Sequence, residues 1–337
     1  MVNISPRLEQ LMQRGTDFLG TSLAIMGGAM TWISERNLVA AISNGGGFGV
    51  LACGSMSPEQ LRQEIQGTRA LTNKPFGVNL ITLHPQLDPL IQVCLDEKVS
   101  HIVLAGGLPS APAVKKAKDG GAKLICFAPA IAIGKRLVRM GADALVIEGM
   151  EAGGHTGPVS TSVLAQEILP AITDTPIFVA GGIGRGEAIL SYLEMGAAGV
   201  QLGTRFVCAS ECVAHPNFKH AFIHAAARDA ILSIQIDPRF PVIPVRALAN
   251  RGSRLFLEKQ REVISRFDRG ELSKEDAQLE IEHFWAGALR RAVIEGDVET
   301  GSVMAGQSVG MVTEEKPTAA IIEEMIAQAE QALEQRA

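Results

Sequence analysis

The chain has 337 residues, 47% of them hydrophobic, and a net charge of -5 at pH 7. Aromatic residues make up only 4% of the chain, and no run of Lys and Arg is long enough to neutralise a phosphate backbone, which argues against nucleic acid as a partner. The five cysteines include no C-x-x-C pair, and no leader-like start or apolar run approaching membrane-spanning length is found. We therefore expect a cytoplasmic protein with reduced thiols and no membrane contact.

Short apolar runs followed by Gly, Pro or Asn recur along the first two thirds of the chain. They predict eight buried strands: Leu23-Met26, Gly49-Ala52, Phe76-Leu80, His101-Ala105, Leu124-Ala128, Ala144-Ile147, Ile177-Ala180 and Gly199-Leu202. Helical patterns lie between them: Ser57-Arg69, Leu87-Glu97, Pro112-Asp119, Gly134-Met140, Thr161-Ile172 and Gly186-Met195. This alternation predicts an α/β fold, a TIM (β/α)8 barrel. A doubly wound open sheet is less favoured, because Gly27-Gly28-Ala29-Met30 lacks the third glycine of its fingerprint.

The strand and helix period breaks after Phe206. Residues 211–299 read as a helical insertion that covers the rim of the barrel, with helices over His215-Ala227, Val245-Phe267 and Lys274-Ile294. The barrel itself is assigned to residues 1–210 and 300–337. Its last helix is predicted over Thr318-Leu333, whose apolar residues share one face.

Glycines follow the last two predicted strands, where the loops of a barrel rim often hold a phosphate group. Gly181 and Gly182 follow one strand, and Gly203 and Thr204 follow the next. Backbone N–H groups beside glycine can approach an anion closely, and Thr204 adds a hydroxyl. The alternative is that the glycines only permit tight turns, but two such junctions in succession favour a phosphate site.

His155 follows a third glycine-bearing junction, which runs from Glu148 to Gly157. The pair Gly153 and Gly154 lets the backbone approach a flat or phosphorylated ligand and leaves the imidazole on the rim. A lone histidine is usually structural, yet a group with a pKa near neutrality at this place suits proton transfer. No metal site is expected, since His220 and His224 have no third ligand nearby.

The front half of the chain adds residues suited to a planar polar ligand. Asn79 ends the third predicted strand and can hydrogen-bond a ring edge from the rim. Met30 and Met304 are flexible apolar side chains next to glycine, which suit an aromatic ring, although either could also fill a gap in the core. Asn44 is expected to start a turn.

These motifs occur in an order that resembles a known enzyme superfamily. The set Gly28, Asn44-x-Gly-Gly-x-Gly49, Lys74-Pro-Phe-Gly-Val-Asn79, Glu148-Gly-Met-Glu-Ala-Gly-Gly-His155, Ala180-Gly-Gly-Ile183 and Gly203-Thr-Arg-Phe206 resembles the FMN-dependent nitronate monooxygenase and enoyl-acyl-carrier-protein reductase II superfamily. The resemblance covers almost the whole chain, and the motifs of the second half look most like the enoyl reductase branch. Two loops depart from that branch. Gly27-Gly28-Ala29-Met30 lacks the usual first-loop glutamine, and Gly107-Leu108-Pro109 looks like the nitronate monooxygenases.

The resemblance implies an FMN site whose phosphate lies on Gly181, Gly182, Gly203 and Thr204. It places the flavin ring against Gly28, Ala29, Met30 and Asn79 and against the segment from Met304 to Gln307, with His155 facing the reactive side of the ring. Glu148, Gly153 and Gly154 complete the predicted cofactor-binding set, and His155 is the predicted catalytic residue.

The resemblance also implies an activity. We expect the protein to reduce 2-enoyl thioesters with NADH or NADPH, as in fatty acid biosynthesis. The substrate would be a small molecule or an acyl group bound to a carrier protein. The alternatives are oxidation of alkyl nitronates with O2, reduction of quinones by NADH, and a flavin-binding module without catalysis. The sequence does not choose between NADH and NADPH, and a homodimer is compatible with it.

Overall fold

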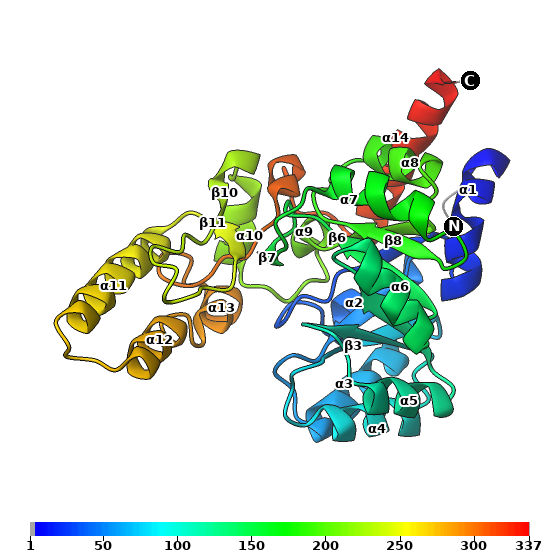
Figure 1. Ribbon diagram of the computed structural model, residues 1–337. Helices are drawn as coiled ribbons and strands as arrows, with labels where there is room; N and C mark the ends of the chain where they lie inside the picture. Colours follow the sequence, from blue (N-terminus) through cyan, green and yellow to red (C-terminus); the bar gives the residue numbers. More distant parts are fainter. Residues whose placement is uncertain (1–3, 337) are drawn as a thin grey trace.

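The computed structural model describes residues 4–336, and an eight-stranded parallel sheet lies at its centre (Figure 1). The sheet runs in the order β1-β9-β8-β6-β5-β4-β3-β2. A bridge between Met26 and Phe48 joins the two edge strands, so the sheet closes into a barrel. The strands are β1 (Ile25–Gly27), β2 (Gly49–Ala52), β3 (Phe76–Ile81), β4 (His101–Ala105), β5 (Lys123–Phe127), β6 (Ala144–Glu148), β8 (Ile177–Ala180) and β9 (Gly199–Leu202).

Helices connect the strands and pack around the barrel. They are α2 (Arg36–Asn44), α3 (Pro58–Leu71), α4 (Leu87–Asp96), α5 (Ala111–Asp119), α6 (Ile131–Met140), α7 (Thr161–Ile168), α8 (Gly186–Glu194) and the short α9 (Thr204–Val207). The TIM barrel predicted from the sequence is confirmed, and each predicted strand coincides with an observed one within two residues at either end. Asn44 is the last residue of α2, and the expected turn follows it directly at Gly45 and Gly46. The side-chain amide of Asn44 donates to the carbonyl of Leu71.

Alternate side chains of the strands divide the core into two parts. One set packs outward under the helices, and a smaller cluster that includes Met26, Val103, Val146 and Phe178 fills the barrel interior. Helix α1 (Pro6–Leu19) sends Phe18 against this inner cluster, with its ring 6.2 Å from that of Phe178. The interior is therefore filled, and a site can form only at a rim.

The insertion is only partly helical, which corrects the sequence prediction. It contains α10 (Pro216–Ile223), β10 (Ala230–Leu232), β11 (Val245–Leu248), α11 (Arg251–Asp268), α12 (Lys274–His283), α13 (Ala288–Arg290) and one π-helical turn over residues 291–295. The predicted helix over Val245-Phe267 was wrong in its first residues. Pro244 precedes a strand with alternating burial, and the helix begins only after Asn250, whose side chain caps it.

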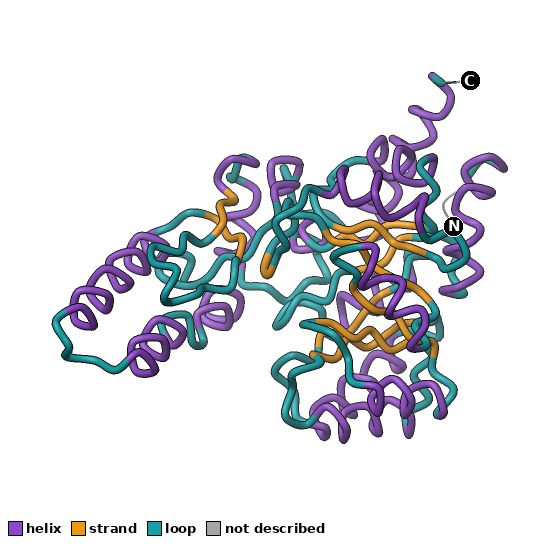
Figure 2. Tube along the Cα trace, in the orientation of Figure 1, coloured by secondary structure: helices purple, strands orange, loops and turns teal. Residues whose placement is uncertain are grey.

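The insertion is joined to the barrel through a small second sheet in the order β10-β11-β7, separate from the barrel strands (Figure 2). Its third strand, β7 (Gly154–His155), comes from the loop after β6, so the rim of the barrel supplies one edge of this sheet. Helices α11 and α12 extend from it as a lobe with its own core of Phe240, Phe256, Val263 and Ile281 (Figure 1). The domain boundaries and the covering of the rim stay predictions.

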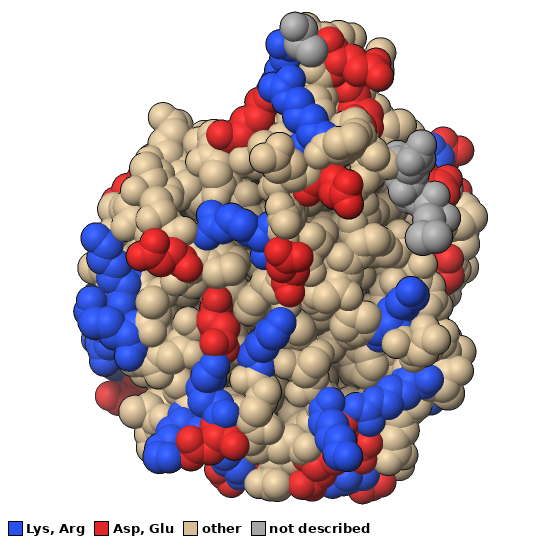
Figure 3. Space-filling view, turned by 90° about the vertical axis from the view of Figure 1, so that its right-hand side faces the viewer, with Lys and Arg blue, Asp and Glu red and all other residues tan. Residues whose placement is uncertain are grey.

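Charges are mixed on the side of the barrel seen in Figure 3, where Lys and Arg side chains alternate with Asp and Glu. This face therefore presents no large area of a single sign. No helix among the described residues combines the length and the hydropathy needed to cross a bilayer.

The C-terminal helix α14 (Thr318–Gln335) packs along α8, as its apolar face predicted. Ile321, Ile322, Met325 and Leu333 are all buried. At Gly186, the first residue of α8, the two backbones come so close that an added Cβ would lie 1.9 Å from the carbonyl oxygen of Met325. The contact excludes any larger residue.

Gly186→Ala is therefore expected to lower the free energy of unfolding by about 1–3 kcal/mol, because the helices must separate to admit the methyl group. Urea denaturation measures the effect. The matched control is Gly157→Ala, since a Cβ at Gly157 meets no atom within 4 Å. Equal midpoints for both variants would contradict the tight packing of α8 on α14.

Candidate functional site

The loops after β8 and β9 form an anion-binding geometry. Gly181 and Gly182 have φ angles of 95° and 73°, which L side chains rarely adopt, so glycine is required in this turn. Among the described residues, the N–H groups of Gly182 and Ile183 donate to no acceptor. Free N–H groups in a glycine turn at the carboxyl end of a strand suit a phosphate group, and this fits the predicted site.

Three remote segments meet beside these loops. The N–H of Gly306 donates to Oγ1 of Thr204 at 3.0 Å, and an added Cβ at Gly153 would lie 2.5 Å from the Gly306 nitrogen. The N–H of Gln307 donates to the carbonyl oxygen of Glu151 at 2.9 Å. The structure thus brings the predicted residues Gly153, Thr204 and Gln307 together, and Thr204 keeps its hydroxyl hydrogen available for another acceptor.

The loop after β1 lies against the loop after β9. An added Cβ at Gly28 would be 3.2 Å from the Cα of Gly203, and one at Gly203 would be 3.4 Å from the sulfur of Met30. Ser34 fixes the loop, because its hydroxyl donates to the carbonyl of Gly28 at 2.8 Å and accepts from the N–H of Met30 at 3.0 Å. Gly28, Ala29 and Met30 therefore form one wall beside the loops that follow β8 and β9.

Polar side chains lie at or near the ends of three barrel strands on the inner face: Asn79 of β3, Glu148 of β6 and Gln201 of β9. Asn79 is 5% exposed and Gln201 is 8% exposed, and neither side-chain amide makes a hydrogen bond to another described residue. Burial raises the pKa of Glu148 to about 7. Two amides that are free to bond a ligand and a carboxyl group that is partly protonated near neutrality fit a polar ring edge. Sequence reasoning missed Gln201, although a polar residue in the otherwise apolar run Gly199–Leu202 was a signal.

Glu151 and Thr161, which were not predicted as site residues from the sequence, hold the loop after β6 in place. The carboxylate of Glu151 accepts hydrogen bonds from the N–H and the hydroxyl of Thr161, each at 2.9 Å. The oxygen of the same hydroxyl lies 3.0 Å from the carbonyl oxygen of Gly181, which is an alternative acceptor for its one hydrogen. These contacts tie the loop that carries Gly153 and Gly154 to the glycine turn after β8. No local sequence pattern predicts these contacts, because residues 151, 161 and 181 meet only in the folded chain.

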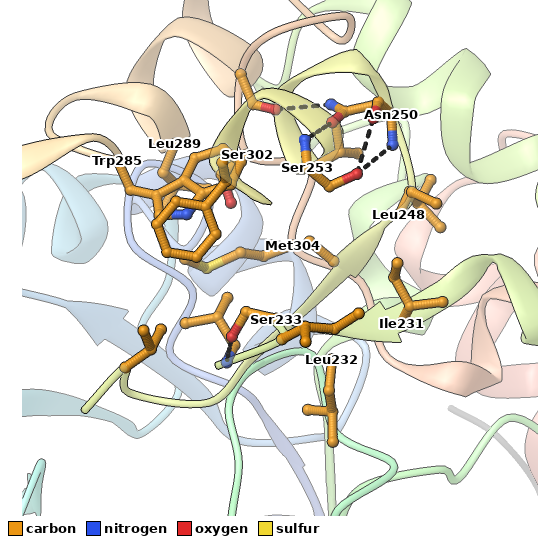
Figure 4. Close-up of a pocket in the computed structure, with 18 of the residues that line it drawn as sticks. Ile231, Leu232, Ser233, Leu248, Asn250, Ser253, Trp285, Leu289, Ser302 and Met304 are labelled. Carbon is orange, nitrogen blue, oxygen red and sulfur yellow. Dashed lines mark hydrogen bonds between the residues drawn. The ribbon is translucent and has the colours of Figure 1, made fainter. Parts of the chain in front are cut away.

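His155 lies on β7, where it pairs with Val245 of β11. Its ring nitrogens have no hydrogen-bond partner among the described residues, and partial desolvation lowers its pKa below the ordinary value. The neutral form of the imidazole, which has one N–H to donate, is therefore favoured. His155 and Met304 both line a pocket of about 460 Å³ between the small sheet and the lobe helices (Figure 4).

Nearly all predicted site residues thus lie on one rim: the loops after β8 and β9, the Gly28–Met30 wall, the Met304–Gln307 segment and His155. Asn79 lies two residues before the end of β3, and Glu148 is the last residue of β6. Their individual roles stay predictions. Across residues 4–336, no group of three or more His, Cys, Asp or Glu side chains is placed to hold a metal ion.

The raised pKa of Glu148 predicts that the free energy of unfolding depends on pH. Because its folded pKa of about 7 exceeds the ordinary glutamate value of 4.5, the native protein favours the protonated form. This contribution to stability is fully present below pH 4.5 and is lost as pH rises through 7. Glu148→Gln, which stays neutral, should gain stability over the wild type across this window. Chemical denaturation at several pH values measures the difference, and a difference that does not change with pH would contradict the burial of this carboxyl group.

Comparisons with known proteins agree with this architecture. The profile of the nitronate monooxygenase family matches residues 13–90 and 88–328. FabK from Thermotoga maritima superposes with a TM-score of 0.86 and 35% identity, covering 96% of this chain and 97% of that one. A nitronate monooxygenase of Paraburkholderia phytofirmans is 27% identical over 94% of this chain and 95% of its own length.

A third relative carries a different activity in its name. The (3aS,4S,5R,7aS)-5-hydroxy-7a-methyl-1-oxo-octahydro-1H-indene-4-carboxyl-CoA dehydrogenase of Rhodococcus jostii is 34% identical over 66% of this chain. The match spans only 62% of that protein's length, and 63% of the dehydrogenase of the same name from Mycobacterium tuberculosis. The family profile, by contrast, extends over most of this chain, from the first helix to the last. The chain belongs to the nitronate monooxygenase family.

Proposed function

We propose that the protein is an FMN-dependent oxidoreductase that reduces 2-enoyl thioesters with NADH or NADPH. The observation that carries the proposal is the position of His155, a neutral and unpartnered imidazole on the wall of an apolar pocket, next to the segment that contacts the phosphate loops. Two relatives support the substrate class. FabK is an enoyl-acyl-carrier-protein reductase II, and the Rhodococcus dehydrogenase is named for a carboxyl-CoA thioester.

The residues on the rim can hold FMN in one orientation. Gly182, Ile183 and Thr204 would bind its phosphate through free N–H groups and a hydroxyl. Asn79 and the partly protonated Glu148 would hydrogen-bond polar atoms of the ring system, and Met30 and Met304 would contact its apolar surface. FMN, when bound, supplies hydride transfer from the nicotinamide to the β-carbon of the enoyl group.

His155 would act on the thioester end of the substrate. A neutral imidazole donates one hydrogen bond, and a carbonyl oxygen that gains negative charge during reduction is a suitable acceptor. His155 is exposed, so the bound substrate would itself cover the imidazole, while the apolar pocket beside it would orient the substrate.

Oxidation of alkyl nitronates with O2 is the second candidate. It is favoured by the full-length match to the Paraburkholderia nitronate monooxygenase and by the Gly107-Leu108-Pro109 loop. In that reaction the N–H of His155 would contact the anionic nitronate. Both candidates use the same rim, so substrate tests must separate them.

Thr204→Glu tests the phosphate position. A carboxylate beside a phosphate dianion repels it, so the Kd for FMN should rise by at least about tenfold. Equilibrium dialysis of the flavin-free protein measures the change. Thr204→Ser keeps the hydroxyl and serves as the control. If Thr204→Glu binds FMN as tightly as Thr204→Ser does, the phosphate lies elsewhere.

His155→Ala tests the activity. The variant should stay yellow, and nicotinamide should still reduce its flavin, because the phosphate contacts remain. Reoxidation of the reduced protein by crotonyl-CoA should slow by roughly 10²–10⁴-fold, the range of a positioned acid–base group. Anaerobic stopped-flow absorbance measures both half-reactions, with the exposed His283→Ala as the matched control.

Two results would count against this proposal. Equal reoxidation rates for His155→Ala and His283→Ala would remove His155 from the reaction. Rapid turnover of propyl-2-nitronate without any response to enoyl thioesters would favour the second candidate.

A further inference from the structure

The pocket beside His155 continues away from the barrel into the insertion. It lies between the strands β10 and β11 and the helices α11 and α13, and its volume is about 460 Å³. Figure 4 shows side chains from these elements turned toward a common hollow. The apolar lining includes Ile231, Leu232, Leu248, Phe256, Trp285 and Leu289. A hollow of this size and composition is typical of a binding site for an apolar group.

Several polar residues on the lining are already occupied by hydrogen bonds within the protein. The side-chain amide of Asn250 donates to the carbonyls of Val298 and Gly301 at 2.8 Å, and its oxygen accepts from the N–H of Ser253. The hydroxyl of Ser253 donates to the carbonyl of Asn250, and that of Ser233 accepts from the N–H of Val245. The hydroxyl of Ser302, the imidazole of His155 and the indole N–H of Trp285 make no hydrogen bond to another described residue. The occupant therefore finds few groups to bind a polar substituent.

The charges on the lining disfavour a dinucleotide as the occupant. Arg254 is the single Lys or Arg residue among the lining residues, and it is exposed. Glu282 also lines the pocket and would repel phosphate groups. A nicotinamide dinucleotide carries a pyrophosphate, which requires more positive charge or a row of free backbone N–H groups. An uncharged occupant fits better.

One end of the pocket is tied to the proposed reaction site. His155 pairs with Val245, and Met304 forms a bridge with Ala247, so both residues lie along β11. Trp285 belongs to the lobe, where its ring lies 5.5 Å from that of Phe256. A ligand that contacts His155 with its head can therefore extend along β11 toward Trp285.

We propose that this pocket binds the apolar acyl group of the thioester substrate, with the carbonyl at His155 and the tail directed into the lobe toward Trp285. This inference rests on the proposed function and adds a specificity determinant to it. The barrel interior is filled, so the lobe and not the barrel sets the length of the acyl chain.

The proposal predicts a dependence on chain length. Each buried CH2 group should raise kcat/KM by about fourfold until the pocket is full. Crotonyl-, 2-octenoyl- and 2-dodecenoyl-CoA form a suitable series. Trp285→Ala lengthens the pocket and should shift the preferred substrate toward longer chains.

Leu289→Trp shortens the pocket, whereas Trp285→Ala lengthens it. The proposal therefore stays testable if one of the two variants fails to fold. The added ring occupies the pocket, so kcat/KM for 2-dodecenoyl-CoA should fall by at least about tenfold while that for crotonyl-CoA changes little. The matched control is Leu279→Ala, which alters an exposed leucine on α12 of the same lobe that does not line the pocket. Chain-length preferences of both pocket variants equal to those of the control would overturn the proposal.

A binding measurement separates this proposal from the proposed function. The sequence has only two tryptophans, so in Trp32→Phe the fluorescence reports on Trp285 alone. Saturated acyl-CoA of increasing chain length should change this emission with increasing affinity. If it does so while no enoyl thioester is turned over, the pocket assignment stands and the proposed reaction fails. If enoyl thioesters are turned over but long acyl chains leave the Trp285 emission unchanged, the acyl group lies elsewhere.

Discussion

The close backbone contact between Gly153 and Gly306, with Thr204 beside them, is the constraint on which the site depends. A Cβ at Gly153 would lie 2.5 Å from the Gly306 nitrogen, and one at Gly306 would lie 2.9 Å from the carbonyl oxygen of Glu151. Only glycine permits this approach. The contact brings the loops after β6 and β9 and the segment that returns from the insertion to one place on the rim.

This contact couples the insertion to the barrel. The chain leaves the barrel after β9 and returns through residues 301–307, whose first part lines the apolar pocket and whose last part donates hydrogen bonds to Thr204 and Glu151. The loop after β6 makes the second connection, since its residues Gly154 and His155 pair with β11. The wall of the pocket and the loops that follow β6 and β9 are therefore connected through backbone contacts, which fix the imidazole relative to both.

Much of the fold was predictable because its signals are local. Buried barrel strands are short apolar runs that end at glycine, and the helix α14 has a clear apolar face, so both could be recognised from the sequence. The strand β11 was read as helix because Val245-Arg-Ala-Leu248 is too short to show a period. Its pairing with β7 is a contact between residues about 90 positions apart, which no local pattern encodes.

Only part of the candidate site has a local signal in the sequence, and the roles of its residues stay predictions. Glycine junctions and His155 stand out in the sequence, whereas Gln201, Ser34 and the Glu151–Thr161 pair depend on how strands and loops meet. The same holds for the acyl pocket, whose walls come from β10, β11, α11 and α13. Its residues are ordinary apolar ones that only the folded chain brings together.

Hydrogen exchange of the flavin-free protein, measured with and without FMN, tests the central claim most directly. If the cofactor phosphate lies where the three segments meet, FMN should slow exchange together in residues 151–155, 181–184, 203–205 and 304–307, while α3 and α4 stay unchanged. FMN binding that leaves residues 304–307 exchanging as before, or that protects only segments remote from this rim, would contradict the account.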